Sequence, residues 1–266
     1  MNADIQDLDG KIIGSVDLPK IFLTSFRPDI IHRVYHAIAT HNLQPQGRDI
    51  LAGQKTSAES WGTGRGASRV ARVKGGGKRG GQAAGVAMVV GGRIPHPPRS
   101  EKKIRKEVNH KERRLALASA IAATAEKYIV SLRGHKIPDE RNLPIIVNDD
   151  IQKISKTSKL LEFFLSINLG DDIERVYRSR KIRSGTSRMR GRTVRTGKGP
   201  LIVVSEDNGV GKAASNIPGI DCVLAKNLTV TDLAPGSQAG RLVVWSKSSI
   251  DNLPKPLLEV SNLIEI

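Results

Sequence analysis

Apolar runs alternate with segments of helical periodicity along the second half of the chain. Short continuous apolar runs are typical of strands that are buried on both faces of a sheet. The predicted strands are PIIVN at 144–148, residues 173–177, LIVVS at 201–205, CVLA at 222–225 and LVVWS at 242–246. The predicted helices between and after them are residues 158–168, residues 211–216 and a final short helix. This order predicts an α/β fold with a mostly parallel sheet and helices on both faces, a three-layer α/β/α arrangement.

The first half of the chain contains three further regular segments. Apolar alternation around the turn Asp9-Gly10 predicts a small hairpin over residues 5–18. Apolar residues at helical spacing after Pro28 predict a helix that ends near Asn42. A capping-box spacing at Asn109 and an apolar stripe predict one long helix that ends near Gly134.

Between these helices, residues 44–99 have no periodicity, and HPPRS at 96–100 predicts the return of helical structure. We therefore expect residues 1–43 and 100–266 to form a single globular α/β domain. Residues 44–99 are then a long extended loop inserted near the N-terminus.

Charge is concentrated in two segments. Residues 61–99 hold eleven Gly, eight Lys or Arg and no acidic residue, and residues 178–198 hold nine Lys or Arg and again no acidic residue. The chain has 43 Lys and Arg, so the other 26 balance its 26 Asp and Glu, and the net charge of +17 resides in these two segments. Such a concentration is typical of a protein that binds a polyanion.

The composition of the two segments favours RNA as that polyanion. Glycine lets a backbone approach a ligand closely, and arginine forks onto phosphates. Aromatic residues are 3% of the chain, so recognition depends on backbone charge and shape more than on base stacking. A glycine-rich segment cannot bury enough apolar area to order itself, so we expect residues 61–99 to be largely disordered alone and to order on a compact RNA. We expect residues 178–198 to form a basic surface loop between two strands of the sheet.

The candidate RNA-binding residues are the basic residues of the two segments. They are Arg65, Arg69, Arg72, Lys74, Lys78, Arg79, Arg93, Arg99, Arg178, Arg180, Lys181, Arg183, Arg188, Arg190, Arg192, Arg195 and Lys198.

Two glycine-containing motifs favour an enzyme only weakly. Residues 75–80 fit the dinucleotide-binding spacing, but no strand precedes them and no amphipathic helix follows. Residues 208–213 resemble a phosphate-binding loop but lack its first glycine and its magnesium-binding hydroxyl. We interpret the second motif as a turn into a helix.

Two groups of titratable residues also have both an enzymatic and a structural interpretation. His32 and His36 have zinc-protease spacing, but Arg33 stands where that motif has its glutamate. Asp149 and Asp150 follow a predicted strand, where α/β enzymes hold catalytic groups, yet the pair is also ordinary turn chemistry. We therefore expect no enzyme activity, no catalytic residue, no metal, no cofactor and no small-molecule substrate.

Other features argue against a membrane-spanning protein and against a secreted protein. No apolar run approaches the roughly 20 residues of a membrane-spanning helix, and no signal-peptide pattern begins the chain. The single cysteine, Cys222, has no partner for a disulfide. We expect a cytoplasmic protein with no membrane partner.

Long motifs in the chain resemble a known family. WGTGRGASRVARVKGGGKRGGQAAG, GGRIPHPPR, NHKERRLALASAIAATA and KIRSGTSRMRGR followed by PLIVVSEDNG are similar to the large-subunit ribosomal protein L4 family in its archaeal and eukaryotic form. The resemblance covers nearly the whole chain. It departs from the bacterial pattern in the loop and lacks the long C-terminal extension of eukaryotic members, which points to an archaeal type.

The resemblance implies a structural constituent of the large ribosomal subunit. Members bind large-subunit ribosomal RNA (rRNA) early in assembly and thread the extended loop inward, so that its tip, here among residues 62–81, lines the nascent-peptide exit tunnel. The implied partners are that rRNA and other large-subunit ribosomal proteins. An alternative is an RNA-binding translational regulator that acts on a structured messenger.

Overall fold

The computed structural model describes residues 2–139 and 141–254. Within them, the residues up to Ala39 and from Glu107 onward form one compact unit, which we call the α/β unit. Residues Thr40–Lys106 form a second unit, which we call the loop unit.

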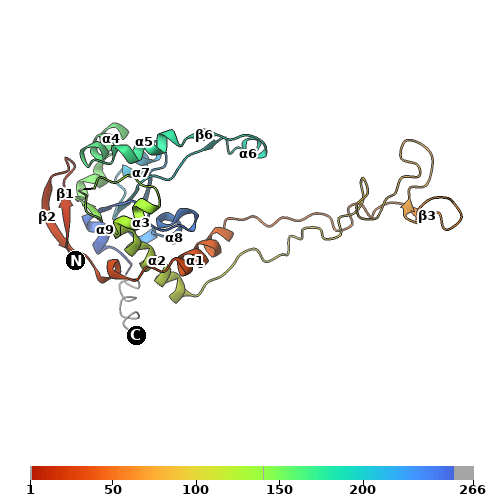
Figure 1. Ribbon diagram of the computed structural model, residues 1–266, viewed down its shortest axis with the longest axis horizontal. Helices are drawn as coiled ribbons and strands as arrows, with labels where there is room; N and C mark the ends of the chain where they lie inside the picture. The colour runs from red at the N-terminus through yellow and green to blue at the C-terminus, as the bar shows by residue number, and fades with distance from the viewer. Residues whose placement is uncertain (1, 140, 255–266) are drawn as a thin grey trace. The chain divides into compact units, whose positions relative to one another are not determined.

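A mixed sheet of six strands organises the α/β unit (Figure 1). Its order is β2-β1-β5-β10-β8-β9, and all neighbouring pairs are parallel except β1 with β2. The strands are β1 (Asn2–Gln6), β2 (Ile12–Asp17), β5 (Ile145–Val147), β8 (Leu201–Val204), β9 (Asp221–Leu224) and β10 (Val243–Ser246). Four of the five strands predicted in the second half of the chain are therefore confirmed.

The N-terminal hairpin forms at the predicted turn but is part of the main sheet. Gly10 has a φ of +79°, a conformation that glycine adopts without steric cost. β1 pairs with β2 on one side and with β5 on the other, where Ile5 lies opposite Ile146. The hairpin thus adds the antiparallel edge that makes the sheet mixed.

Alternate residues of the central strands enter two separate hydrophobic clusters. Leu201 and Val203 of β8 belong to one cluster, and Ile202 and Val204 belong to the other. Since successive side chains of a strand point to opposite faces, both faces of the sheet are buried. Helices α1 (Pro28–Thr40) and α2 (His110–Ala125) contribute to the first cluster, and α4 (Thr157–Ser166) and α7 (Val210–Ser215) to the second.

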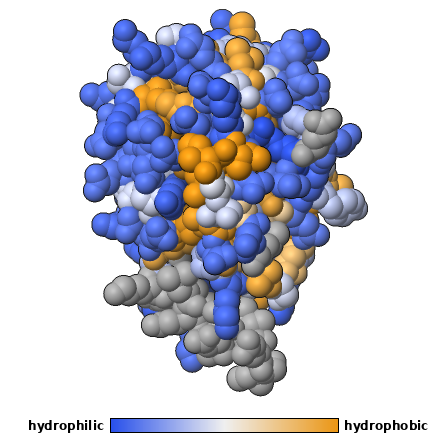
Figure 2. Space-filling view, turned by 90° about the vertical axis from the view of Figure 1, so that its left-hand side faces the viewer, coloured by the Kyte–Doolittle hydropathy of each residue, from blue (hydrophilic) through white to orange (hydrophobic). Residues whose placement is uncertain are grey.

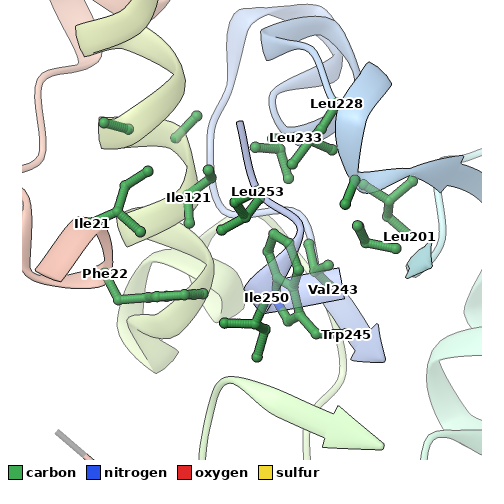
Figure 3. Packing of buried hydrophobic residues seen from close by; sticks show 14 of the residues in the cluster. Ile21, Phe22, Ile121, Leu201, Leu228, Leu233, Val243, Trp245, Ile250 and Leu253 are labelled. Carbon is green, nitrogen blue, oxygen red and sulfur yellow. The ribbon is translucent and has the colours of Figure 1, made fainter. Parts of the chain in front are cut away.

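Trp245 of β10 lies in the middle of the first cluster and is fully buried (Figure 3). Its ring meets Phe22 edge to face, with centroids 5.7 Å apart. Phe22 belongs to a short 3-10 helix, η1 (Lys20–Leu23), which connects the hairpin to α1. The N-terminal segment and β10 are therefore joined through an aromatic contact.

Helices α1, α4 and α7 form where they are predicted, and α9 (Lys247–Asp251) follows β10, after which a short helix is predicted. Helix α8 (Val230–Leu233) and the 3-10 helices η2 (Asp149–Lys153), η3 (Ala225–Asn227) and η4 (Pro235–Ser237) are additional. These additional helices are too short to show a periodic pattern.

The predicted strand at 173–177 is wrong, because these residues belong to helix α5 (Gly170–Arg178). Ile173 and Val176 are buried at a spacing of three residues, together with Leu169 just before the helix. Acidic residues occupy the first turn and Arg175 and Arg178 the last, which matches the helix dipole. The basic segment 178–198 consequently follows a helix and precedes β8.

The long helix predicted from Asn109 is divided into α2 and α3 (Lys127–Leu132). The division falls at Glu126, whose backbone is extended, and no Pro or Gly signals it. The predicted capping box is absent, since the Asn109 side chain makes no cap hydrogen bond and Glu112 pairs with Arg33 of α1. Helical structure also returns at His110 rather than near residue 100, where only a turn forms.

β2 leaves one edge of the sheet open. Ile12 and Ile13 are 65% and 60% exposed. Figure 2 faces the side on which Figure 1 shows β1 and β2, and apolar surface there is surrounded by hydrophilic residues.

Candidate nucleic-acid interface

The loop unit brings its two ends together. The backbone N–H of Arg48 donates to the Pro98 carbonyl at 3.2 Å, and the ring of His41 donates to the Lys106 carbonyl at 2.9 Å. A Cβ on Gly47 would lie 2.8 Å from the backbone nitrogen of Ser100, so only glycine allows this approach. Hydrogen bonds thus join the two ends of the loop unit.

The tip of the loop unit, residues 59–84, is joined by hydrogen bonds rather than irregular throughout. β3 (Glu59–Ser60) pairs with β4 (Ala71–Arg72) in an antiparallel ladder. Beyond the ladder, the Val73 amide donates to Gln82, and the Ala84 amide donates to Ala71. These hydrogen bonds join residues within a segment that composition alone predicts to be disordered.

Arg72 organises this tip. Its guanidinium carbon lies 5.3 Å from the ring centroid of Trp61, a cation–π contact. The same guanidinium donates to the Gly81 carbonyl at 2.9 Å and to the Ser68 hydroxyl at 3.0 Å. Arg72 is therefore occupied by contacts within the chain.

Residues 178–198, which we call the arm, form a further small hairpin (Figure 1). β6 (Lys181–Ile182) pairs with β7 (Val194–Arg195), and the short helix α6 (Thr186–Met189) lies between them. Lys181 lies directly opposite Arg195, so two exposed cations share one face of the hairpin. Like charges in that position repel, and an anion between them relieves the repulsion.

The base of the arm is held by a largely buried ion pair. Arg175 donates to Asp172 through Nε at 2.9 Å and to the Lys198 carbonyl through Nη2 at 2.9 Å. The Ser179 hydroxyl accepts from the Gly197 amide at 2.9 Å. The two ends of the arm are thereby joined through side chains of α5 and the residue after it.

The buried guanidinium of Arg241 holds the residues that follow the arm. Arg241 is 1% exposed and donates to the carbonyls of Gly199 and Asp232 and to the carboxylate of Asp221 at 2.6 Å. Lys198 pairs with the same carboxylate at 2.7 Å. Burial would raise the pKa of Asp221, but Arg241 and Lys198 hold it below its usual value.

Asp172 connects the arm to a buried histidine. Its carboxylate accepts from His135 Nδ1 at 3.1 Å and from the Lys136 amide at 2.9 Å. Burial lowers the pKa of His135, so the imidazole is neutral at pH 7. Burial acts to raise the pKa of Asp172, yet the hydrogen bonds from His135 and Arg175 keep it below its ordinary value.

The predicted RNA-binding residues fall into two groups by their contacts. Arg72, Lys74, Arg178 and Lys198 make side-chain contacts within the protein, the last three with Glu59, Glu174 and Asp221. The side chains of the other thirteen predicted RNA-binding residues make no hydrogen bond or ion pair within residues 2–139 and 141–254. The exposed members of this second group are Arg65, Arg69, Lys78, Arg79, Arg99, Arg180, Lys181, Arg188, Arg190, Arg192 and Arg195, while Arg93 and Arg183 are half-buried.

Sequence reasoning missed the residues that hold these cations in place. These residues are Arg175, Asp172 and Arg241. They lie outside the acid-free segments, so the concentration of charge in those segments does not reveal them. A signal exists for Asp172 and Arg175, whose spacing of three residues suits a helical ion pair once the segment is read as a helix.

The positions that suggested an enzyme are occupied by structural contacts. At the carboxyl end of β5, Asp149 accepts from the amide and the hydroxyl of Ser248, and Asp150 pairs with Lys153. Asp207 accepts from the amides of Gly209 and Gly211 in the turn that begins α7. These carboxylates therefore stabilise turns and helix starts.

His32 and His36 do lie together, with ring centroids 4.3 Å apart. His32 also bonds to the Ser237 hydroxyl. The described part of the chain contains no group of three or more His, Cys, Asp or Glu that could hold a metal ion. It also contains no helix long and apolar enough to cross a membrane.

The fold and charge distribution define a class of basic α/β proteins with a glycine-rich insertion and a basic hairpin arm. Comparison with known proteins gives the family: the chain belongs to the ribosomal protein L4/L1 family, whose model matches residues 16–255.

Curated relatives cover nearly the full chain. A protein of Methanothrix thermoacetophila called large ribosomal subunit protein uL4 is 46% identical over 257 residues, which are 97% of this chain and 100% of the relative. Proteins of the same name from Methanosphaera stadtmanae and Saccharolobus islandicus are 43% and 46% identical, over 94% and 96% of this chain and 95% of each relative. The family predicted from the motifs is thus confirmed.

Proposed function

We propose that this protein is a structural constituent of the large ribosomal subunit and binds large-subunit rRNA through the arm and the loop unit. Membership of the L4/L1 family and the names of the curated relatives support the first part. The protein acts without catalysis of its own, as a ribosomal protein. Its other partners are neighbouring large-subunit proteins.

The facing cations of the arm carry the RNA-binding part of the proposal. Lys181 and Arg195 lie side by side on one face of the hairpin, exposed and without an acidic partner in the described residues. The arm itself holds no acidic residue. Arg178 and Lys198 at its two ends pair with Glu174 and Asp221, and repulsion among the cations between them is unrelieved in the described residues. Phosphates supply the missing charge, and their binding releases counterions from the RNA.

The loop unit extends the interface inside the particle. Its tip contains Arg65, Arg69, Lys78 and Arg79, all exposed. Arg72 and Trp61 stabilise the turn that presents these side chains. Together with the family, this arrangement supports a tip that lies in rRNA at the wall of the nascent-peptide exit tunnel.

Stoichiometric association with the particle tests the proposal. A tagged chain is expressed in cells, and large subunits are purified on a sucrose gradient in about 0.1 M salt, where contacts between basic side chains and phosphates persist. An integral constituent sediments with the large-subunit fraction at one copy per particle. Absence from that fraction, or recovery only with free messenger RNA, would support the regulator instead.

A further inference from the structure

A groove on the α/β unit lies outside the candidate nucleic-acid interface. Its volume is about 530 Å³, and its apolar walls come from the segment before α1, from α3 and from the segment after η4. Tyr128 and Leu132 of α3 are 72% and 74% exposed, and Phe26 is 40% exposed. Large apolar side chains gathered in this way on a soluble surface mark interaction sites.

Arg133 lines the groove and carries a hydrogen-bond donor without a partner in the described residues. One of its terminal nitrogens, Nη2, donates to the Pro235 carbonyl at 2.8 Å. The other, Nη1, is buried and finds no acceptor among residues 2–139 and 141–254. A buried donor without a partner is costly, so an acceptor supplied from outside the chain would be favoured.

The charges around Arg133 favour an acidic acceptor. Arg175 and Arg241 are near enough to act on Arg133 electrostatically, and each has its own carboxylate in Asp172 or Asp221. Arg133 has none in the described chain. Burial first, and then these two cations, lower the pKa of Arg133 to about 10, which still leaves it charged at pH 7.

We infer that this groove is the docking site for a segment of another large-subunit protein that places an apolar side chain between Phe26 and Leu132 and a carboxylate on Arg133. The inference rests on the proposed function, since it requires the chain to lie in the large subunit. Apolar walls and a rim that includes Glu126 suit a peptide better than the phosphates of RNA. The net charge of +17 disfavours a second copy as the occupant.

Site-specific crosslinking in assembled particles tests this site. The photoreactive residue p-benzoylphenylalanine replaces Tyr128 in one chain and Tyr177 in another, because Tyr177 is exposed on α5 and does not line the groove. Large subunits containing each chain are irradiated and the crosslinked partners are identified. Position 128 is expected to yield one protein segment that contains an acidic residue next to a large apolar one, and position 177 is expected not to yield it.

Matched substitutions assign the contact to Arg133. Arg133→Ala in the chain carrying the probe at position 128 should reduce the protein crosslink by on the order of tenfold, because a hydrogen bond to a charged group is removed. Lys136→Ala removes an exposed cation three residues away that does not line the groove, and should leave the yield unchanged. Melting of each free variant checks that the fold is intact.

The outcomes separate this inference from the proposed function. A chain absent from large subunits would defeat the proposed function and the docking site together. A chain present in subunits whose position 128 crosslinks to rRNA, to its own residues, to a second copy or to nothing would overturn the docking site alone. A protein crosslink that is unaffected by Arg133→Ala would also overturn it.

Discussion

Arg175 should fix the arm in place without itself touching RNA. Its side chain is 26% exposed and joins the carboxylate of Asp172 to the carbonyl of Lys198. Arg175→Ala leaves this carboxylate buried with fewer donors and releases the end of the arm. The loss of a mostly buried ion pair of this kind costs about 2 to 3 kcal/mol of unfolding free energy.

The effect on RNA binding should be entropic. Freeing the backbone at Lys198, whose carbonyl loses the Arg175 donor, adds about 1 to 2 kcal/mol of ordering cost when RNA binds. Binding should then weaken by roughly tenfold or more. The slope of log K against log salt should not change, because every candidate phosphate-binding side chain is still present.

The assay compares Arg175→Ala with two other variants in salt titrations of rRNA binding. Arg190→Ala removes an exposed arm cation and should make the slope shallower by about 0.7 to 0.9 while leaving thermal stability unchanged. Lys159→Ala removes an exposed cation of α4 and should change neither quantity. Trypsin should cut the arm faster only in Arg175→Ala. A shallower slope for Arg175→Ala, or an arm as resistant as in the unaltered chain, would refute the reasoning.

Three further predictions concern the loop tip, the core and the buried histidine. Arg72→Ala should lose about 1 kcal/mol or more of local stability at the tip, seen as faster hydrogen exchange at the Ala84 amide, and unchanged exchange there would contradict the role of Arg72. Trp245→Ala should destabilise the α/β unit by about 3 to 5 kcal/mol in urea unfolding, and a cost below about 1 kcal/mol would show that the site is not packed as described. The folded pKa of His135 is lowered, so the unfolded chain binds more protons just below pH 6.5, and stability should fall as pH decreases from 7 through that range. His135→Asn should remove this part of the pH dependence, as measured by melting temperature between pH 7 and pH 5.

The sequence predicted the central strands because their burial on both faces leaves a continuous apolar run. β8 and β10 are four residues each, yet every residue in them is buried. Segment 173–177 failed because the apolar residues of a short helix can be mistaken for those of a strand. The fixed charges at both ends of α5 were the better signal there.

The candidate interface, like the fold, was predicted from the sequence only in part. Local composition locates the acid-free segments, and no tertiary information is needed for that. The contacts that hold them, such as Arg241 with Gly199 and Asp221, join residues 20 to 42 positions apart in the chain. Such pairings depend on the fold, so a single sequence does not reveal them, and the same is true of the groove around Arg133.

The most direct test of the central claim is a salt titration of binding to large-subunit rRNA, with duplex DNA as competitor. The full chain is compared with one that lacks residues 61–99 and with one that lacks residues 180–196. About eight phosphate contacts give a slope steeper than about −5, and each deletion should make the slope shallower while RNA remains preferred over DNA. Equal affinity for DNA, or a slope that neither deletion changes, would contradict the assignment of RNA binding to these two segments.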